Sequence, residues 1–548
     1  MIVLIRNAQW VVAWDATLGQ HFYRQGVDVV FDGNRLVHID SDYTGKADQI
    51  IDGSAFCVMP GMVDVHTHLQ SESLGRGLIE ELGNPALYMT GILDEKSVFV
   101  TSGLTDQAGG AAAQLAANAA STRNAIAELL KSGATTVVDL AVAYDGWLDL
   151  LAETGIRAVA APMYRDAKWH VPTGHRLDYL WDLEKGRRDF ATALEAVDAA
   201  MRHPSGRLSA MIAPMQIDTC GLELLRDSLA AARQRGLKMT VHCSQHIPEF
   251  QEMVRRHGVT PVQWMHENGL LGRDTLLGHA LFLDHHSLVQ WWTRRDLDLL
   301  AETGTSVAHC PVVFSRYGQM MEDVGSYIRK GVNVAIGTDT EPQNMAEELR
   351  MASTMGRAAA RSVRGVWLSE LFHAATIGGA TALGRDDLGR LAVGAKADLV
   401  MLDLDAPGMR PVRDPLRSFV FSAADRAVRH VFVDGRQVVK DGMVLTIDHK
   451  ALSRALQTSQ DAFVRNAPYV DFRGRSADEI SPTSFRVEGR NRAALALNRS
   501  TRFPEAPSSS TSGRRPSPLL FQVLRCGILA ALRAHPVGGP ASRSALCP

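Results

Sequence analysis

Two histidines, His66 and His68, stand one residue apart in the stretch GMVDVHTHLQ, directly after a short apolar run. In an extended strand, residues i and i+2 point to the same face, so the two imidazoles would lie side by side. Imidazole nitrogens are common ligands of Zn²⁺ and similar ions. This spacing therefore indicates part of a metal site, although a surface pair or a pair satisfied by hydrogen bonds has the same spacing.

Three further polar residues end apolar segments: His242 ends KMTVH, His279 ends DTLLGH and Asp339 ends VNVAIGTD. A catalytic Zn²⁺-type site takes N and O ligands from the protein and leaves one position open to water. Each residue also has a structural alternative. A lone histidine can be a core imidazole bonded to backbone, and Asp339 could cap the helix predicted for EPQNMAEELRMA. Their recurrence at one kind of position favours the metal site.

Short apolar runs, each followed by a helical pattern, recur along the middle of the chain. The helical stretches include Asn124–Lys131 and Leu222–Arg235. The eight predicted strands are Met62–His66, Thr135–Leu140, Ile156–Ala161, Leu208–Ala213, Lys238–His242, Thr275–His279, Ser306–His309 and Val332–Asp339. Eight such units predict an α/β fold, a (β/α)8 TIM barrel over residues 61–385, with active-site residues at the carboxyl ends of its strands.

The segments that flank the barrel read as strands and turns. Residues 1–60 and residues 386–450 both alternate apolar and polar positions, with turns at Asp32-Gly33-Asn34 and Asp434-Gly435. We expect them to pair into one small β-sandwich. Residues 451–548 form a C-terminal extension that we expect to be largely disordered from about residue 473, where the composition changes. We assign this tail no function and expect truncation near Arg475 to be tolerated.

Composition restricts the partners. The chain is 46% hydrophobic and 22% charged with a net charge of −2, which favours a soluble protein that binds neither nucleic acid nor a membrane. No apolar run reaches membrane-spanning length. The six cysteines are scattered without a CxxC pair, which indicates a reduced, cytoplasmic protein. The expected partner is a small-molecule substrate.

Several motifs identify a family. They are PGMVDVHTHL, LLKSGATTVVDL, TVHCSQ, LLGHALFL, VAHCPV, IGTDT and TIGGATALGRDDLGRLAVGAKADLVMLD. With them the chain resembles the metal-dependent amidohydrolase superfamily over roughly residues 1–450, in the branch of deaminases and s-triazine hydrolases. The resemblance implies that His66, His68, His242 and Asp339 bind one divalent metal ion per subunit. It also implies that His279 bonds the substrate or the attacking water, and that the protein is a homo-oligomer.

The sequence does not identify the metal, because a site of three histidines and an aspartate can bind Zn, Fe, Co or Mn. We expect Zn first. The predicted fourth strand, LSAMIAPMQIDTC, has no lysine that could bridge two ions, which favours a mononuclear site. In such a site the ion would activate water, Asp339 would accept and pass on a proton, and His279 would orient the water or polarise a carbonyl.

Two departures from the family pattern bear on the substrate. Ring deaminases of this branch carry a glutamate where this chain has Gln245, and Met215 replaces a strand-4 histidine. A glutamine amide does not titrate, so it can hold a carbonyl or a urea N–H but cannot protonate a ring nitrogen. Glu249 could substitute, although a helix surface is its ordinary place.

With Gln245 and the HTHLQSESLGRG stretch, the chain looks most like the phenylurea hydrolases and molinate hydrolase. That resemblance implies cleavage of an open-chain urea, amide or carbamate, for example an N-aryl urea herbicide such as linuron or diuron, with release of an aromatic amine. The alternative is a deaminase or dechlorinase acting on an N-heterocycle such as an s-triazine. A non-catalytic scaffold is a third interpretation, which the intact ligand set disfavours.

An aryl substrate calls for an apolar pocket. The candidate wall residues are Leu69, Leu74, Met89, Trp169, Phe314 and Tyr317. His309 ends the seventh predicted strand and is expected to support the site from behind. The segment from Gln70 to about Thr122 is long for a connection after a strand, and we expect it to form a lid.

Overall fold

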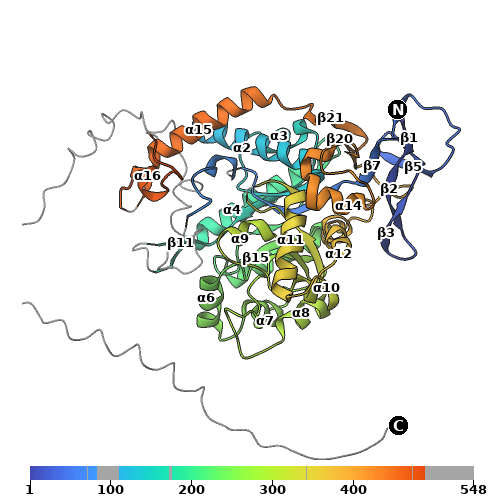
Figure 1. Cartoon of the computed structure of the whole chain (residues 1–548). Helices are drawn as coiled ribbons and strands as arrows, with labels where there is room; N and C mark the ends of the chain where they lie inside the picture. The colour runs from blue at the N-terminus through green and yellow to red at the C-terminus, as the bar shows by residue number, and fades with distance from the viewer. Residues whose placement is uncertain (71, 83–109, 172–175, 341, 472, 488–548) are drawn as a thin grey trace, which may run out of the picture. The chain divides into compact units, whose positions relative to one another are not determined.

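Parallel strands in a closed ring form the centre of the protein. The computed structural model describes residues 1–70, 72–82, 110–171, 176–340, 342–471 and 473–487. The ring consists of β8 (Met62–Thr67), β9 (Ala134–Ala141), β10 (Arg157–Tyr164), β13 (Leu208–Ala210) with β14 (Ala213–Pro214), β15 (Met239–Cys243), β16 (Thr275–His279), β17 (Ser306–His309) and β18 (Asn333–Ile336). The predicted (β/α)8 barrel is confirmed (Figure 1).

Single bridges close the ring between its two ladders. Ile212 pairs with Met239 and Gln216 with His242 at one junction, and Thr67 pairs with Asp339 at the other. The fourth strand is split into β13 and β14, with Met211 and Ile212 between them. The eighth strand ends at Ile336, so Asp339 lies in the loop beyond it and not in the strand as the sequence suggested.

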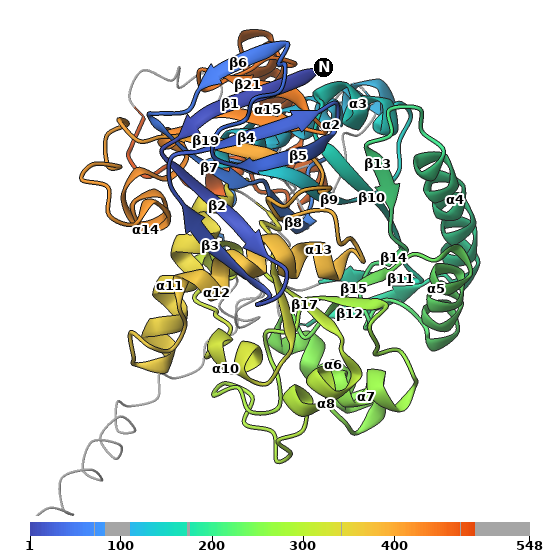
Figure 2. The ribbon, with the colours of Figure 1, turned by 90° about the vertical axis from the view of Figure 1, so that its right-hand side faces the viewer.

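Helices follow the strands, and most of them cover the outside of the barrel. They are α2 (Gly110–Ser132), α3 (Trp147–Thr154), α4 (Leu183–Met201), α5 (Leu222–Arg235), α6 (Ile247–His257), α7 (Pro261–Glu267), α8 (Asp296–Thr303), α9 (Pro311–Arg316), α10 (Val324–Arg329), α11 (Met345–Ala360), α12 (Leu368–His373) and α13 (Gly379–Ala382). Figure 2 shows α4 and α5 outside the strands. Within the described ranges, no helix is long and apolar enough to cross a membrane.

Strands from both ends of the chain form the β-sandwich. One sheet holds β1 (Ile2–Ala8), β4 (Val27–Asp32), β5 (Arg35–Asp40) and β6 (Gln49–Asp52). The other joins β2 (Trp10–Asp15), β3 (Gln20–Arg24) and β7 (Phe56–Pro60) to β19 (Leu399–Asp403), β20 (Val428–Val433), β21 (Arg436–Lys440) and β22 (Met443–Val444). In Figure 2 the blue N-terminal strands lie beside the orange strand β19. The expected sandwich is confirmed.

A buried ion pair ties the sandwich to the barrel. Arg157, the first residue of β10, donates two hydrogen bonds to the carboxylate of Asp398, at 2.8 and 3.0 Å, and a third to Asp434 at 2.9 Å. The side chains of Arg157 and Asp398 are both 3% exposed. Because a bidentate pair fixes direction as well as distance, it holds the sandwich at one orientation against the barrel.

The C-terminal extension begins with a long helix, α15 (His449–Val470), which lies against α2 (Figure 1). Phe463 packs with Leu74 and Ala117, and the Gln460 amide donates to the carbonyls of Leu74 and Arg76 at 2.9 and 2.7 Å. Leu74 therefore belongs to this small core and is not a pocket wall. The helix supports the segment that follows the first barrel strand.

Structural elements also continue past the expected onset of disorder near residue 473. A short helix, α16 (Ala477–Ile480), starts with a capping box formed by Ser476 and Glu479. Arg475 pairs with Asp471 at 2.7 Å. Residues 488–548 lie outside the described residues, so a dispensable tail stays a prediction only for that part.

We predict that Phe463→Ala destabilises the protein by about 3 kcal/mol, because it empties a buried aromatic site at the junction of α15, α2 and the post-β8 segment. The free energy of unfolding in urea measures this. Tyr469→Ala removes an aromatic ring that is 70% exposed on the same helix and serves as the control, with little expected change. Equal stability of the two variants would contradict the proposed support by α15.

Candidate metal centre

Four imidazoles and one carboxylate converge at the carboxyl end of the barrel. The possible ligand atoms of His66, His242 and His279 lie within 4.8 Å of one another. The same is true of those of His66, His68 and Asp339. His68 Nε2 lies 3.3 Å from His242 Nε2 and 3.6 Å from Asp339 Oδ1. His279 Nε2 lies 3.6 Å from Asp339 Oδ2. The five residues singled out as strand ends thus form one cluster.

The backbone of the same residues holds the cluster together. The Asp339 N–H donates to the His66 carbonyl at 2.7 Å, and the His68 N–H donates to the Asp339 carbonyl at 3.0 Å. Asp339 and His279 have φ angles of 56° and 86°, a left-handed conformation that costs free energy in residues other than glycine. This turn directs the Asp339 carboxylate back over the barrel mouth.

Two glycines make room for His66. A Cβ atom at Gly278 would lie 2.7 Å from His66 Cε1, and one at Gly337 would lie 2.7 Å from His66 Cβ. Any larger residue at either position would displace the imidazole. The glycines of LLGHALFL and IGTDT therefore have a steric role next to the candidate ligands.

The hydrogen bonds around the histidines leave nitrogen atoms for a metal ion. His68 Nδ1 contacts the Leu140 carbonyl at 2.9 Å and His242 Nδ1 contacts the Met215 carbonyl at 2.5 Å, so each turns its Nε2 inward. Both ring nitrogens of His66 and of His279 are buried without a hydrogen-bond partner. Because unsatisfied buried polar atoms are costly, a cation among them fits this donor set.

The charge state also suits a cation. Burial and the neighbouring imidazoles lower the pKa of His66 and His279 well below the ordinary value, and burial lowers that of His242 to about 3. These rings are therefore neutral at physiological pH, the form that binds metals. Cys310 Sγ also lies near His279 and Asp339, but burial raises the pKa of its thiol, which keeps it a poor ligand.

A buried carboxylate beneath the cluster was not foreseen from the sequence. Asp64 accepts hydrogen bonds from the Thr338 hydroxyl at 2.6 Å and from the Thr338 and His66 N–H groups at 3.2 Å. Burial raises the pKa of Asp64 to about 7. It links β8, two residues before His66, to the loop after β18, one residue before Asp339. The aspartate in VDVHTH is the signal that could have indicated this role.

The loop after β15 carries Gln245, whose amide nitrogen is buried without a partner. Glu249 is fully buried, and its carboxylate accepts the N–H groups of Ser244 and Gln245 at 2.7 and 2.8 Å. The expected helix-surface position of Glu249 is therefore wrong. His246 is also buried, and its Nδ1 caps α6 by accepting the Glu249 N–H at 3.1 Å. Glu249 fixes the backbone that presents Gln245.

The candidate wall residues divide into two groups. Phe314 packs edge-on against His279 with ring centroids 4.6 Å apart, and Tyr317 follows it at the end of α9 with its hydroxyl buried and without a partner. His309 is buried nearby, and burial lowers its pKa to about 4. Leu69 is fully buried in the main core, to which Phe314 also belongs. Met89, and much of the expected lid, lie outside the described residues.

Trp169 belongs to a hairpin, β11 (Ala167–His170) with β12 (Asp178–Trp181), that leans toward the Gln245 loop. Its indole ring lies 5.1 Å from the His246 ring. The Trp169 Nε1–H and the Tyr179 hydroxyl both donate to Asp218 at 2.8 Å. One buried carboxylate thus fastens both strands of the hairpin.

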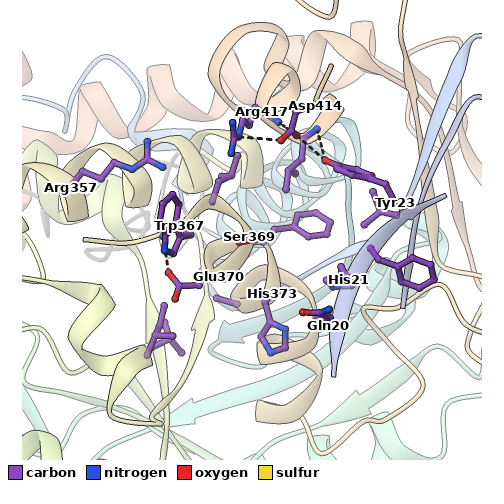
Figure 3. Close-up of a pocket in the computed structure, with 18 of the residues that line it drawn as sticks. Gln20, His21, Tyr23, Arg357, Trp367, Ser369, Glu370, His373, Asp414 and Arg417 are labelled. Carbon is purple, nitrogen blue, oxygen red and sulfur yellow. Dashed lines mark hydrogen bonds and ion pairs between the residues drawn. The ribbon is translucent and has the colours of Figure 1, made fainter. Parts of the chain in front are cut away.

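A separate cavity of about 860 Å³ lies between β3, α12 and α14 (Pro415–Ser418) (Figure 3). It adjoins Asn333 at the amino end of β18, the barrel side away from the candidate metal centre. Three of its polar residues pair with each other: Tyr23 donates to Asp414 at 2.9 Å, and Asp414 binds Arg417 at 3.1 Å. In the described part of the chain, no set of three potential metal ligands lies there.

Comparisons with known proteins agree with this architecture. Residues 57–438 match the model of the amidohydrolase family. A 5-methylthioadenosine/S-adenosylhomocysteine deaminase of Halobacterium salinarum is 30% identical over 83% of this chain and 98% of its own length. A 5'-deoxyadenosine deaminase of Methanosarcina mazei is 28% identical over 84% of this chain and 98% of its own.

Two solved structures share the fold. An adenosine deaminase from Xanthomonas campestris with bound zinc has a TM-score of 0.71 at 24% identity and covers 84% of this chain and 98% of its own. The zinc complex of an atrazine chlorohydrolase from Arthrobacter aurescens has a TM-score of 0.71 at 22% identity and covers 84% of this chain and 100% of its own. The chain therefore belongs to the amidohydrolase family and is an enzyme acting on carbon–nitrogen bonds.

Proposed function

We propose that this protein is a metal-dependent aminohydrolase that replaces the amino group of an aromatic N-heterocycle by oxygen and releases ammonia. The observation that carries the proposal is the cluster of His66, His68, His242, His279 and Asp339, in which the ring nitrogens of His66 and His279 are buried and unsatisfied. The deaminases among the relatives support a heterocyclic substrate over an open-chain urea. The proposed substrate is therefore an N-heterocycle, which was the alternative in the sequence analysis, and not the N-aryl urea expected first.

In this proposal the three histidines and Asp339 hold one divalent ion, with zinc favoured because two structural neighbours contain it. The ion, when bound, would lower the pKa of water towards neutrality. Asp339 lies 3.6 Å from both His68 and His279, where its carboxylate can accept the water proton and deliver it to the departing amine.

His279 and Gln245 position the reacting groups. Because the lowered pKa of His279 keeps it neutral, one ring nitrogen donates and the other accepts a hydrogen bond, which suits it to orient water. The Gln245 amide can donate to a ring nitrogen as negative charge develops there, although it cannot transfer a proton. Phe314 beside His279 and Trp169 beside His246 provide flat apolar surfaces for an aromatic ring.

Hydrolysis of an N-aryl urea is the second candidate, and Gln245 is the observation that favours it. A urea carbonyl needs a hydrogen-bond donor but no ring protonation, so a non-titrating amide is sufficient. The two candidates share the metal centre and differ in the role of Gln245.

Product analysis distinguishes the candidates. We expect the zinc-loaded protein to release ammonia from 5'-deoxyadenosine or an amino-substituted triazine, measured by chromatography and an ammonia assay. Aniline from an N-aryl urea, with the heterocycles unchanged, would replace the first proposal by the second. A release of neither product by the metal-loaded protein would reject both.

We predict that His66→Ala lowers kcat/KM by more than about 100-fold and abolishes stoichiometric metal, because it removes a central ligand while the barrel core remains. Metal content by mass spectrometry and far-UV circular dichroism are the measurements. His266→Ala, an exposed histidine on α7, is the control. Full metal content in His66→Ala would show that the cluster is not the metal site.

We predict that Gln245→Glu raises kcat/KM for an amino-heterocycle by about 10-fold or more, because a carboxylic acid can protonate the ring nitrogen. The protonated form is the active one, so this gain should disappear as the pH rises through the pKa of the new carboxyl. An N-aryl urea should show no such gain. A pH–rate profile of Gln245→Glu beside Gln245→Ala is the measurement, and a pH-independent loss with both variants would contradict the assigned role.

A further inference from the structure

Arg165 is a half-buried cation at the mouth of the barrel. It directly follows β10, and its Nη1 lies 3.3 Å from the Met215 sulfur. Among the described residues, no carboxylate lies within ion-pair distance of its guanidinium. Burial lowers its pKa, and the more distant carboxylates of Asp218 and Asp189 act against that shift. A guanidinium has five N–H donors, and a thioether is a weak acceptor, so most of its hydrogen-bonding capacity is unused.

Its position places it beside the candidate metal centre. Met163 and Ala213 lie in the apolar cluster inside the barrel, and Arg165 and Met215 stand two residues further along the same two chain segments. The Met215 carbonyl is the partner of His242 Nδ1. Met215 therefore contacts both Arg165 and the candidate metal ligand His242. These contacts lie at the carboxyl ends of the third and fourth strands of the barrel.

Arg165 also faces an open cavity of about 660 Å³, lined by residues at the carboxyl ends of β9 and β10 and by α4 and β12. Three other charged residues of this cavity have partners: Lys185 pairs with Asp189, and Asp166 accepts the Gly221 N–H at 2.8 Å. Asp182 caps α4 through the Lys185 N–H at 2.9 Å. The unpaired positive charge of the cavity wall therefore centres on Arg165, with the exposed Lys168 at its edge.

We propose that Arg165 binds an oxyanion carried by the substrate, so that the heterocycle bears an acidic side group. A planar guanidinium can donate two parallel hydrogen bonds to a carboxylate or a phosphate, and such a bond is strong where water is largely excluded. This inference rests on the proposed function for the reacting ring, whereas the anion subsite itself rests on Arg165 and its cavity. The Met215 sulfur contacts the guanidinium, and because a thioether is neutral it leaves the positive charge available for an anion.

The test compares three compounds that share one amine-bearing ring: adenosine, adenosine 5'-carboxylate and adenosine 5'-monophosphate. With zinc-loaded protein, we expect kcat/KM for at least one acid to exceed that for adenosine by 30-fold or more, and the better acid identifies carboxylate or phosphate. Arg165→Gln should bring this ratio close to one, and Arg165→Lys should keep part of it. Lys185→Gln removes an already paired charge from the same cavity and is the control.

A binding measurement separates this inference from the proposed function. Benzoate, phenyl phosphate and neutral benzamide are titrated by calorimetry into the wild type, Arg165→Gln and Arg165→Lys, with thermal melts to verify folding. Binding of an anion that weakens at least 10-fold in Arg165→Gln supports the subsite even if none of the nucleosides is deaminated, which would count against the proposed function alone. Equal binding in all variants, or a ratio of kcat/KM that Arg165→Gln leaves unchanged, would overturn the inference.

Discussion

The closure between the first and last barrel strands is the constraint on which the site depends. The hydrogen bonds that join these strands at the barrel mouth belong to His66, His68 and Asp339 themselves. The hydrogen bonds that close the barrel therefore also bring the candidate ligands together. A register shift between β8 and β18 would break the ring and separate the imidazoles from the carboxylate together. Asp64, bonded to Thr338 and His66, secures this junction from beneath.

The sequence was sufficient for the elements that follow local rules. Apolar strands with helical segments between them predicted the barrel, and histidines at the strand ends predicted which edge carries the chemistry. The position of Asp339 could not be predicted from local rules, because its left-handed backbone in the loop after β18 depends on contacts with β8. Its alternative as a helix cap is excluded, since Asn344 caps α11 through the Ala346 and Glu347 N–H groups.

The residues that sequence reasoning misplaced are those whose roles depend on tertiary contacts. Glu249 lies on a helical pattern, which predicted a place on the helix surface, yet it is fully buried and accepts the Gln245 N–H. Leu74 was predicted to face substrate, and its partner Phe463 lies on a helix far along the chain. No local pattern indicates such pairings. Nor did any local pattern single out Arg165, because an arginine after a strand is normally solvated.

Strands β7 and β19 pair with each other but are synthesised at very different times. Met59 of β7 pairs with Val400 of β19, so one edge of β7 has no partner until most of the chain has left the ribosome. An unpaired strand edge is a template for association with other chains. A polypeptide released before β19 would therefore expose this edge, and its yield should depend on chaperones in a way that the finished protein does not.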